Sequence, residues 1–352
     1  MDKATLEALR NYRPEDKAAL ATIIRSKGST PRGIGTSFLI YADGRTVGTI
    51  GGGCAEAEVK QGALTAIDYN EVKIHHVDLT GDVAEDEGMV CGGIMDVIIE
   101  PIQDPGLFQE MESYLAENKN IYSCLVVGGA ERENVGKRAI YDREGNFISG
   151  TQIIERLKAE WLAAEPMLVN LDTSAGTMEV FIQPVTPPNS LLILGAGYIA
   201  QALVASAGEL DFEITVVDDR ADFANPAKLP GARVICNKFT KALENYPVTE
   251  NTYIVIVTRG HRYDAECLRQ VISSPAAYIG MIGSRRRTRL LLRQLEEEGY
   301  PREELAKVKT PIGLDIGGET PGEIAISILA EIILKKRKGT LLLENSTEKL
   351  NT

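Results

Sequence analysis

The chain has 352 residues, of which 44% are hydrophobic and 25% are charged, a composition typical of globular proteins that can bury a core. At about 150 residues per domain, the length predicts two domains and excludes a small module stabilised only by disulfides or metal ions. The 50 acidic residues outnumber the 38 basic residues and give a net charge of −12, so binding to nucleic-acid phosphates is not expected.

Cysteine usage and hydropathy narrow the expected compartment. The 5 cysteines show no close pairing, which argues against a disulfide framework. Residues 1–13 lack the apolar core of a signal sequence, and no run of 18 uncharged apolar residues occurs. We therefore expect a cytoplasmic protein without a membrane partner, and a homodimer is a reasonable expectation for a chain of this size.

The first half of the chain contains short runs of β-forming residues separated by turn signals such as Asp43-Gly44. We expect strands over residues 19–25, 37–41, 46–50, 72–77 and 95–100, and a helix over 55–67. These elements predict a smaller α+β domain over residues 1–184.

Two segments of this half resemble each other. The run GTSFLIYADGRTVGTI from Gly35 is similar to GKRAIYDREGNFISG from Gly136, and MDVIIEP from Met95 is similar to MEVFIQP from Met178. The similarity fits a duplicated unit of hairpin, helix and strand. It also fits two hairpins that use the same turn chemistry.

Two glycine-rich loops of the first half carry chemistry. Gly28 to Gly35 is a loop whose Arg32 could contact an anion. Gly51, Gly52, Gly53 and Cys54 lead from a strand into the helix-like run. The helix dipole favours the thiolate form of a cysteine at this place, although Glu56 and Glu58 in the same turn oppose it.

A second cysteine, Cys91, precedes two glycines and a strand. Cysteines in glycine loops are more often exposed than cysteines inside apolar runs, so Cys54 and Cys91 are better candidates for chemistry than Cys124, Cys236 and Cys267. Alternatively, both are small residues that fill tight turns. His75 and His76 are adjacent on a strand and point to opposite faces, which argues against a shared metal site.

The prolines Pro184, Pro187 and Pro188 mark a linker at 185–190. Strands and helices then alternate, which predicts a parallel sheet covered by helices on both faces, a Rossmann-like domain, over 191–340. We expect strands over 191–194, 213–217, 233–236, 253–257 and 278–282, and helices over 199–209, 264–272, 284–298 and 321–336. The last helix opens with a capping box at Thr320 and Glu323, and residues 341–352 form a polar tail.

The clearest motif of the second half directly follows its first strand. Gly195, Ala196 and Gly197, continued by Tyr198 and Ile199, form the turn of the dinucleotide fingerprint. The first glycine makes the turn, the second lets a pyrophosphate approach the backbone, and the helix N-terminus faces the anion. Asp218, at the end of the next strand, could accept ribose hydroxyls. A Rossmann-like sheet that binds another ligand stays open as an alternative.

Two more loops leave strands at the edge where open α/β sheets place ligands. One holds Arg259 and His261, where the histidine is either an acid, base or anion ligand or a helix-start residue held by Asp264. The other holds Gly283, Ser284 and Arg285, with Ser284 as the expected N-cap. Arginines are unfavourable at a helix N-terminus, so they indicate either a bound phosphate or a solvated basic face.

Seven segments together resemble the XdhC/CoxI family of xanthine dehydrogenase accessory proteins. They are GSTPRGIG, GTIGGGCAEAEV, CGGIMDVIIEP, LLILGAGYIAQALV, TRGHRYD, YIGMIGSRRR and PIGLDIGGETPGEIAISILAEI. The resemblance implies a maturation factor, rather than an enzyme, that binds molybdenum cofactor as molybdopterin or its dinucleotide form. It would protect the cofactor while a cysteine desulfurase supplies a sulfido ligand, and deliver it to a xanthine dehydrogenase-type molybdoenzyme.

The same resemblance places the family's GGGC cysteine on Cys54, as the candidate molybdenum ligand, and its CGG cysteine on Cys91. Glycines 51–53, Arg32 and Glu56 complete the expected cofactor site. A larger apolar residue would be expected after the cysteine, where this chain has Ala55. The alternative is an NAD(P)-dependent oxidoreductase with ribose on Asp218 and His261 as acid or base, but it leaves both cysteine loops without a role.

Overall fold

The computed structural model describes residues 1, 3–79 and 92–338. The chain divides into two compact units, Met1–Pro187 (the N-terminal unit) and Pro188–Thr352 (the C-terminal unit). Strand β10 (Gly176–Val185) ends the first and strand β11 (Asn189–Leu194) opens the second. The connection, 186–188, is therefore shorter than the predicted linker, because both neighbouring strands extend into the proline-rich segment.

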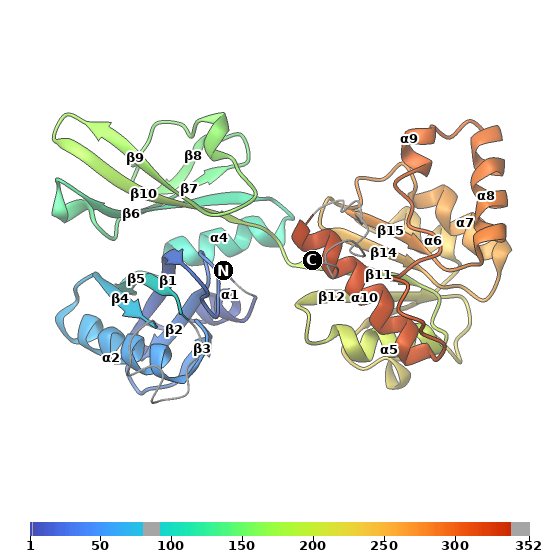
Figure 1. Cartoon of the computed structure of the whole chain (residues 1–352), viewed down its shortest axis with the longest axis horizontal. Coiled ribbons are helices and arrows are strands. Elements are labelled where there is room, and N and C mark those ends of the chain that lie inside the picture. Colours follow the sequence, from blue (N-terminus) through green and yellow to red (C-terminus); the bar gives the residue numbers. More distant parts are fainter. Residues whose placement is uncertain (2, 80–91, 339–352) are drawn as a thin grey trace, which may run out of the picture. The chain divides into compact units, whose positions relative to one another are not determined.

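The C-terminal unit is built on a parallel sheet of five strands in the order β13-β12-β11-β14-β15 (Figure 1). After β11 its elements are α5 (Tyr198–Ala207), β12 (Phe212–Asp218), β13 (Arg233–Cys236), α6 (Phe239–Glu244), β14 (Thr252–Ile256), α7 (His261–Val271), β15 (Tyr278–Met281), α8 (Arg285–Glu297), α9 (Arg302–Leu305) and α10 (Pro321–Lys338). The short helices α6 and α9 were not predicted from the sequence.

Both faces of this sheet are covered. Leu191 and Ile193 of the central strand pack into a core with α5 and α10, whereas Leu192 and Leu194 pack into a second core with α6, α7 and α8. Strands buried on both faces are continuous apolar runs, as β11 is. The predicted Rossmann-like domain is confirmed. Its strand order reverses between β11 and β14, which is where ligands of such sheets bind.

The N-terminal unit contains two antiparallel sheets (Figure 1). Its elements are α1 (Lys3–Arg10), β1 (Ala18–Lys27), β2 (Ser37–Tyr41), β3 (Thr46–Gly48), α2 (Gly53–Tyr69), β4 (Lys73–Asp78), β5 (Ile94–Pro101), α4 (Gly106–Ala116), β6 (Ile121–Gly129), β7 (Arg138–Asp142), β8 (Phe147–Gly150), β9 (Met167–Thr173) and β10. The prediction of an α+β domain is confirmed.

The repeat suspected from the sequence is present in the strand order. The first sheet is ordered β3-β2-β1-β5-β4 and the second β8-β7-β6-β10-β9, so each strand has a counterpart five positions later. Helices α1 and α4 precede the two sheets in the same way. The helix expected in both copies occurs only in the first, as α2. In the second copy residues 151–166 contain only the 3-10 turn Ala159–Trp161, and Leu157 packs on the second sheet.

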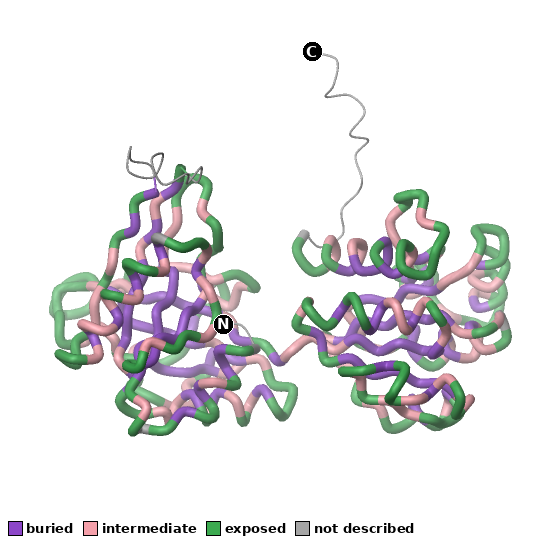
Figure 2. Tube along the Cα trace, turned by 90° about the horizontal axis from the view of Figure 1, so that it is seen from below, coloured by how far each residue is buried: buried purple, intermediate pink, exposed green. Residues whose placement is uncertain are grey.

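The two sheets pack against each other through matching positions. Ile24 and Ile98 of the first sheet meet Val127 and Phe181 of the second in one buried cluster. Both sheets bulge here, between Ile23 and Arg25 in one and beside Val127 in the other. Figure 2 shows the buried residues of each unit concentrated in its sheets. The glycine-rich loops at the ends of the strands lie outside these cores.

Candidate functional site

The turn from β11 to α5 has the geometry that its glycines predict. Gly195 has φ +109°, and a Cβ there would lie 2.5 Å from the carbonyl oxygen of Val257. At Gly197 a Cβ would meet no atom within 4 Å. Only Gly195 is therefore required by the fold, whereas Gly197 leaves open space beside the helix N-terminus, where a phosphate could approach the backbone. The next residue, Tyr198, is 72% exposed, and Ile199 packs against the core.

Asp218 ends β12 beside this turn, but its carboxylate is already fully used. Oδ2 accepts hydrogen bonds from the backbone N–H of Ala196 at 2.8 Å and from Arg220 Nη2 at 2.9 Å. Oδ1 accepts from Arg220 N at 3.0 Å and Nε at 2.9 Å. Burial raises the pKa of Asp218, but the hydrogen bonds outweigh it and the pKa is lowered. The expected ribose contact would require Arg220 to move away first.

The role of the residue after Asp218 was not predicted from the sequence. Asp219 accepts a hydrogen bond from Arg259 Nη2 at 3.0 Å, and the same guanidinium donates to the Tyr263 hydroxyl at 2.5 Å. The other carboxylate oxygen of Asp219 is buried and has no hydrogen-bond partner among the described residues. The signal that could have found this contact is the run Asp218-Asp219-Arg220 directly after a strand. The ion pair joins the loops after β12 and β14 on either side of the Gly195 turn.

The remaining candidates of this unit lie in helix-start loops. His261 is the first residue of α7, and its side chain is outside the described part. Ser284 is the N-cap of α8, as predicted, but its side chain makes no capping hydrogen bond. Gly283 precedes it with φ +157°. Arg285 lies 3.8 Å from Asp315, and both side chains are more than four-fifths exposed, so this pair contributes little stability.

In the N-terminal unit three loops predicted to act together meet. A Cβ on Gly93 would lie 2.5 Å from the carbonyl oxygen of Ser29, and a Cβ on Gly51 would lie 2.2 Å from Pro31 Cβ and 3.3 Å from Arg32 Cγ. The loop from Gly28 to Gly35 therefore touches both glycine loops. Cys54 lies in the first turn of α2, with a side chain outside the described part, and Cys91 lies outside the described residues.

Polar groups fix the GGGC turn. Thr49 accepts a hydrogen bond from the backbone N–H of Gly51 at 3.0 Å and donates its hydroxyl to Glu56. Glu56 is therefore tied to the strand side of the turn. Arg32 is exposed and has no ion pair with any residue that the structure describes. Gly52, the N-cap of α2, has φ +75° and open space at its Cβ, and Gly53 has the same open space.

The other cysteines and the histidine pair do not join this site. Cys124 and Cys267 are buried and Cys236 is exposed. His75 lies 3.3 Å from Glu58, whereas His76 lies 2.7 Å from Asp96. Within residues 1, 3–79 and 92–338, no cluster of three or more His, Cys, Asp or Glu side chains could hold a metal ion.

Comparison with known proteins identifies the family. A profile described as "XdhC and CoxI family" matches residues 12–78, and one described as "XdhC Rossmann domain" matches residues 191–332. The two together cover more than half of the chain. A two-unit protein with a Rossmann sheet behind a glycine-cysteine loop unit is what these profiles define, and the chain belongs to the XdhC/CoxI family.

Three curated bacterial proteins are similar over most of the chain. A protein of Bacillus subtilis that is named as one of the probable xanthine dehydrogenase subunits is 26% identical over 92% of this chain and 94% of its own. "Molybdenum cofactor insertion chaperone PaoD" of Escherichia coli is 22% identical over 90% and 82%. The uncharacterized protein YqeB of Escherichia coli is 29% identical over 93% of this chain, which spans only 46% of YqeB.

A solved structure has the same overall fold. A crystal structure described as a xanthine dehydrogenase from Bacillus halodurans superposes with a TM-score of 0.78 and 25% identity, covering 95% of this chain and 96% of the other. Among the described residues, no helix is both long and apolar enough to cross a membrane.

Proposed function

We propose that this protein is a carrier of molybdenum cofactor. It binds the cofactor as cargo, protects it while a cysteine desulfurase supplies the terminal sulfido ligand, and inserts it into a xanthine dehydrogenase-type molybdenum hydroxylase. Membership of the XdhC/CoxI family and the similarity to PaoD, which is named a molybdenum cofactor insertion chaperone, support this role.

The observation that carries the proposal is the meeting of three loops in the N-terminal unit. The loop that contains Arg32 touches Gly51 on one side and Gly93 on the other, and these two glycines belong to the cysteine-bearing segments GGGC and CGG. At Gly52, Gly53 and Gly92 a Cβ would meet no atom within 4 Å. The backbone there is open to a ligand, next to two cysteine positions in the sequence.

The chemistry of these residues suits the cargo. Molybdenum bound by dithiolene sulfurs is soft, so a thiolate from Cys54 is a suitable ligand or sulfur relay. The phosphate of the pterin is an anion, for which Arg32 and the backbone N–H groups at the start of α2 are suitable partners. Glu56, which is held by Thr49, keeps the turn in shape rather than contacting the anion.

The decisive experiment is anaerobic incubation with molybdenum cofactor, followed by measurement of retained pterin fluorescence and molybdenum. Wild type should retain both, and Cys54→Ser should lose most of them. Cys236→Ser is the matched control, because Cys236 is an exposed cysteine of the C-terminal unit. Equal retention by Cys54→Ser and Cys236→Ser, or no retention by wild type, would refute the proposal.

An NAD(P)-dependent oxidoreductase is the second candidate, favoured by the open space at Gly197. It predicts NAD(P)H binding in the micromolar range and hydride transfer that Cys54→Ser leaves unchanged. Against it, the hydrogen bonds from Ala196 and Arg220 occupy the carboxylate of Asp218. Titration of wild type and Cys54→Ser with NADH and NADPH separates the two candidates.

A further inference from the structure

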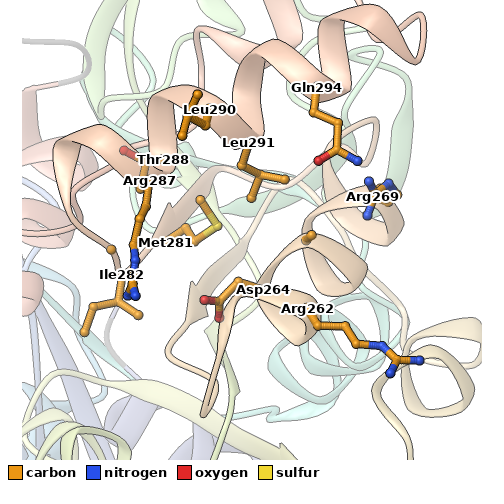
Figure 3. Close-up of a pocket in the computed structure, with 12 residues that line it drawn as sticks. Arg262, Asp264, Arg269, Met281, Ile282, Arg287, Thr288, Leu290, Leu291 and Gln294 are labelled. Atoms are coloured by element: carbon orange, nitrogen blue, oxygen red, sulfur yellow. The ribbon is translucent and has the colours of Figure 1, made fainter.

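A pocket of about 490 Å³ opens between α7 and α8 of the C-terminal unit, at the end of β15 (Figure 3). Its volume lies within the range of small-molecule sites. Strand β14 separates β15 from β11 in the sheet, so the pocket is about two strand spacings, roughly 10 Å, from the Gly195 turn. It is therefore a site separate from the dinucleotide fingerprint.

The middle of the pocket is apolar. Met281 forms its floor at the end of β15, Ile282 follows it, and Leu290 and Leu291 face them from α8. Leu290 is 57% exposed, although it lies on a helix with five arginines. A large apolar side chain exposed at a concave surface is typical of a ligand-binding wall.

The charges around the pocket are unevenly used. Arg269 donates two hydrogen bonds to Glu298, both at 2.6 Å. Arg262 and Arg287 have no hydrogen bond or ion pair with any described side chain. Figure 3 shows Arg287 extending from α8 on one side of the pocket, next to Ile282, with Arg262 and Arg269 on the other side. In a chain with a net charge of −12, an unpaired arginine beside a cavity indicates an anionic ligand.

One carboxylate limits where that anion can lie. Asp264 is 5% exposed, lines the pocket from α7 and accepts a hydrogen bond from the Thr258 hydroxyl at 2.5 Å. Its negative charge repels an anionic group nearby but favours a ring edge that carries N–H donors. The pocket therefore has an anion-binding side at Arg287, an apolar centre, and an acceptor at Asp264.

We propose that the α7–α8 pocket binds a phosphorylated heteroaromatic compound of nucleotide size, with its ring on Met281 and Leu290 and its phosphate on Arg287. Two sources have this chemistry, a nucleoside monophosphate and a phosphorylated pterin. The proposal goes beyond the carrier function and does not depend on Cys54.

The test is calorimetric titration of the full-length protein with AMP, GMP, CMP, UMP and a pterin monophosphate, and with the nucleosides and inorganic phosphate as truncated probes. At least one phosphorylated ring compound should bind about tenfold more tightly than its nucleoside and than phosphate. The compound that binds best identifies the source. If no phosphorylated ring compound binds more tightly than inorganic phosphate, the proposal is wrong.

Variants locate the binding. Arg287→Glu should weaken binding by about tenfold or more, since it replaces a charge-assisted hydrogen bond with repulsion. Arg289→Glu makes the same change of charge two residues further along α8, at an exposed residue outside the pocket, and should change the affinity by no more than about twofold. Leu290→Asn should weaken ring binding but leave phosphate binding unchanged.

Equal losses in Arg287→Glu and Arg289→Glu would show a general charge effect and overturn the proposal. Both arginines are exposed, so both variants should fold, which circular dichroism checks. Cys54→Ser serves as an independent arm. Because it is expected to bind these compounds like wild type, failure of the carrier proposal and failure of this proposal give different results.

Discussion

Arg138 is an arginine enclosed between the two sheets of the N-terminal unit, with a side chain only 7% exposed. It donates hydrogen bonds to Glu100 at 2.6 Å and to Ser123 at 2.5 Å. Glu100 corresponds in the repeat to Gln183, which donates to the carbonyl oxygen of Gly35 at 2.7 Å instead. One copy of the repeat thus has an ion pair where the other has a neutral hydrogen bond.

This pair predicts a pH-dependent stability effect. At pH 7, Arg138→Met should lower the free energy of unfolding by about 3–5 kcal/mol, because Glu100 is left buried and charged without a partner. Burial raises the pKa of Glu100 above its ordinary value of 4.5, and Arg138 opposes that rise. Without Arg138 the pKa rises further, so the loss should shrink as the pH falls through this raised pKa and the carboxyl becomes neutral.

Urea unfolding of wild type and Arg138→Met at pH 7.5 and pH 5 measures the effect. The double variant Glu100→Gln/Arg138→Met is the control, because it removes the buried charge at both pH values. A loss of stability that is the same at pH 7.5 and pH 5 would contradict this account.

The buried cysteines should be chemically silent. Burial raises the pKa of the Cys124 thiol to about 12 and also raises the pKa of Cys267, and a protonated, buried thiol is a poor nucleophile. A maleimide should label the exposed Cys236 in the native protein and label Cys124 and Cys267 only in urea. Mass spectrometry of the digested protein reads out each site, and native labelling of Cys124 as fast as Cys236 would be inconsistent with the fold.

At the scale of elements, the β11–α5 turn separates two roles of glycine. Gly195 has a positive φ and sits against the backbone of Val257, whereas Gly197 has neither constraint. The capping box of α10 is equally local. Glu323 Oε2 accepts from Thr320 N at 2.9 Å and Glu323 N donates to the Thr320 hydroxyl at 3.3 Å, as the sequence predicted.

Alanine at the two glycines should have opposite consequences. Gly195→Ala should destabilise the protein by more than about 1 kcal/mol, because of its strained backbone and the close carbonyl oxygen. Gly197→Ala should cost at most about 1 kcal/mol, the difference expected at an N-cap, but it places a methyl group where a phosphate would approach. Thermal unfolding compares the two, and a larger loss in Gly197→Ala would contradict the turn geometry.

At the scale of the whole molecule, each unit has its own cores. Clusters around α5 and α10 and around α6 to α8 belong to the C-terminal unit, and the clusters of the two antiparallel sheets belong to the N-terminal unit. Only the short segment 186–188 connects β10 with β11. A domain with its own core can fold alone.

We therefore expect fragments 1–187 and 188–352, produced separately, to fold. Each should unfold cooperatively in urea, and the two urea m-values should sum to about that of the full chain if the units share little buried surface. Circular dichroism of the separate fragments checks this. An N-terminal fragment without a cooperative transition would show that its sheets need the other unit.

Much of the fold follows from local pattern. The apolar runs and the glycine turn after Leu194 predict the Rossmann sheet, because strand and helix periodicity is written in neighbouring residues. The similarity of the segments from Gly35 and Gly136 likewise indicated the repeat. The GGGC and CGG loops were selected for the same reason, since glycine and cysteine at a strand end have few structural uses.

Contacts between distant segments could be decided only by the tertiary structure. The binding of Asp218 to Arg220 and Ala196, the contact of Gly28–Gly35 with both glycine loops and the pocket beside Arg287 all join residues that no local pattern pairs. The helix missing from the second copy of the repeat is a further example. Residues 151–166 pack instead as irregular chain on the second sheet, because burial of apolar side chains depends on the surface that the rest of the fold presents rather than on helix propensity alone.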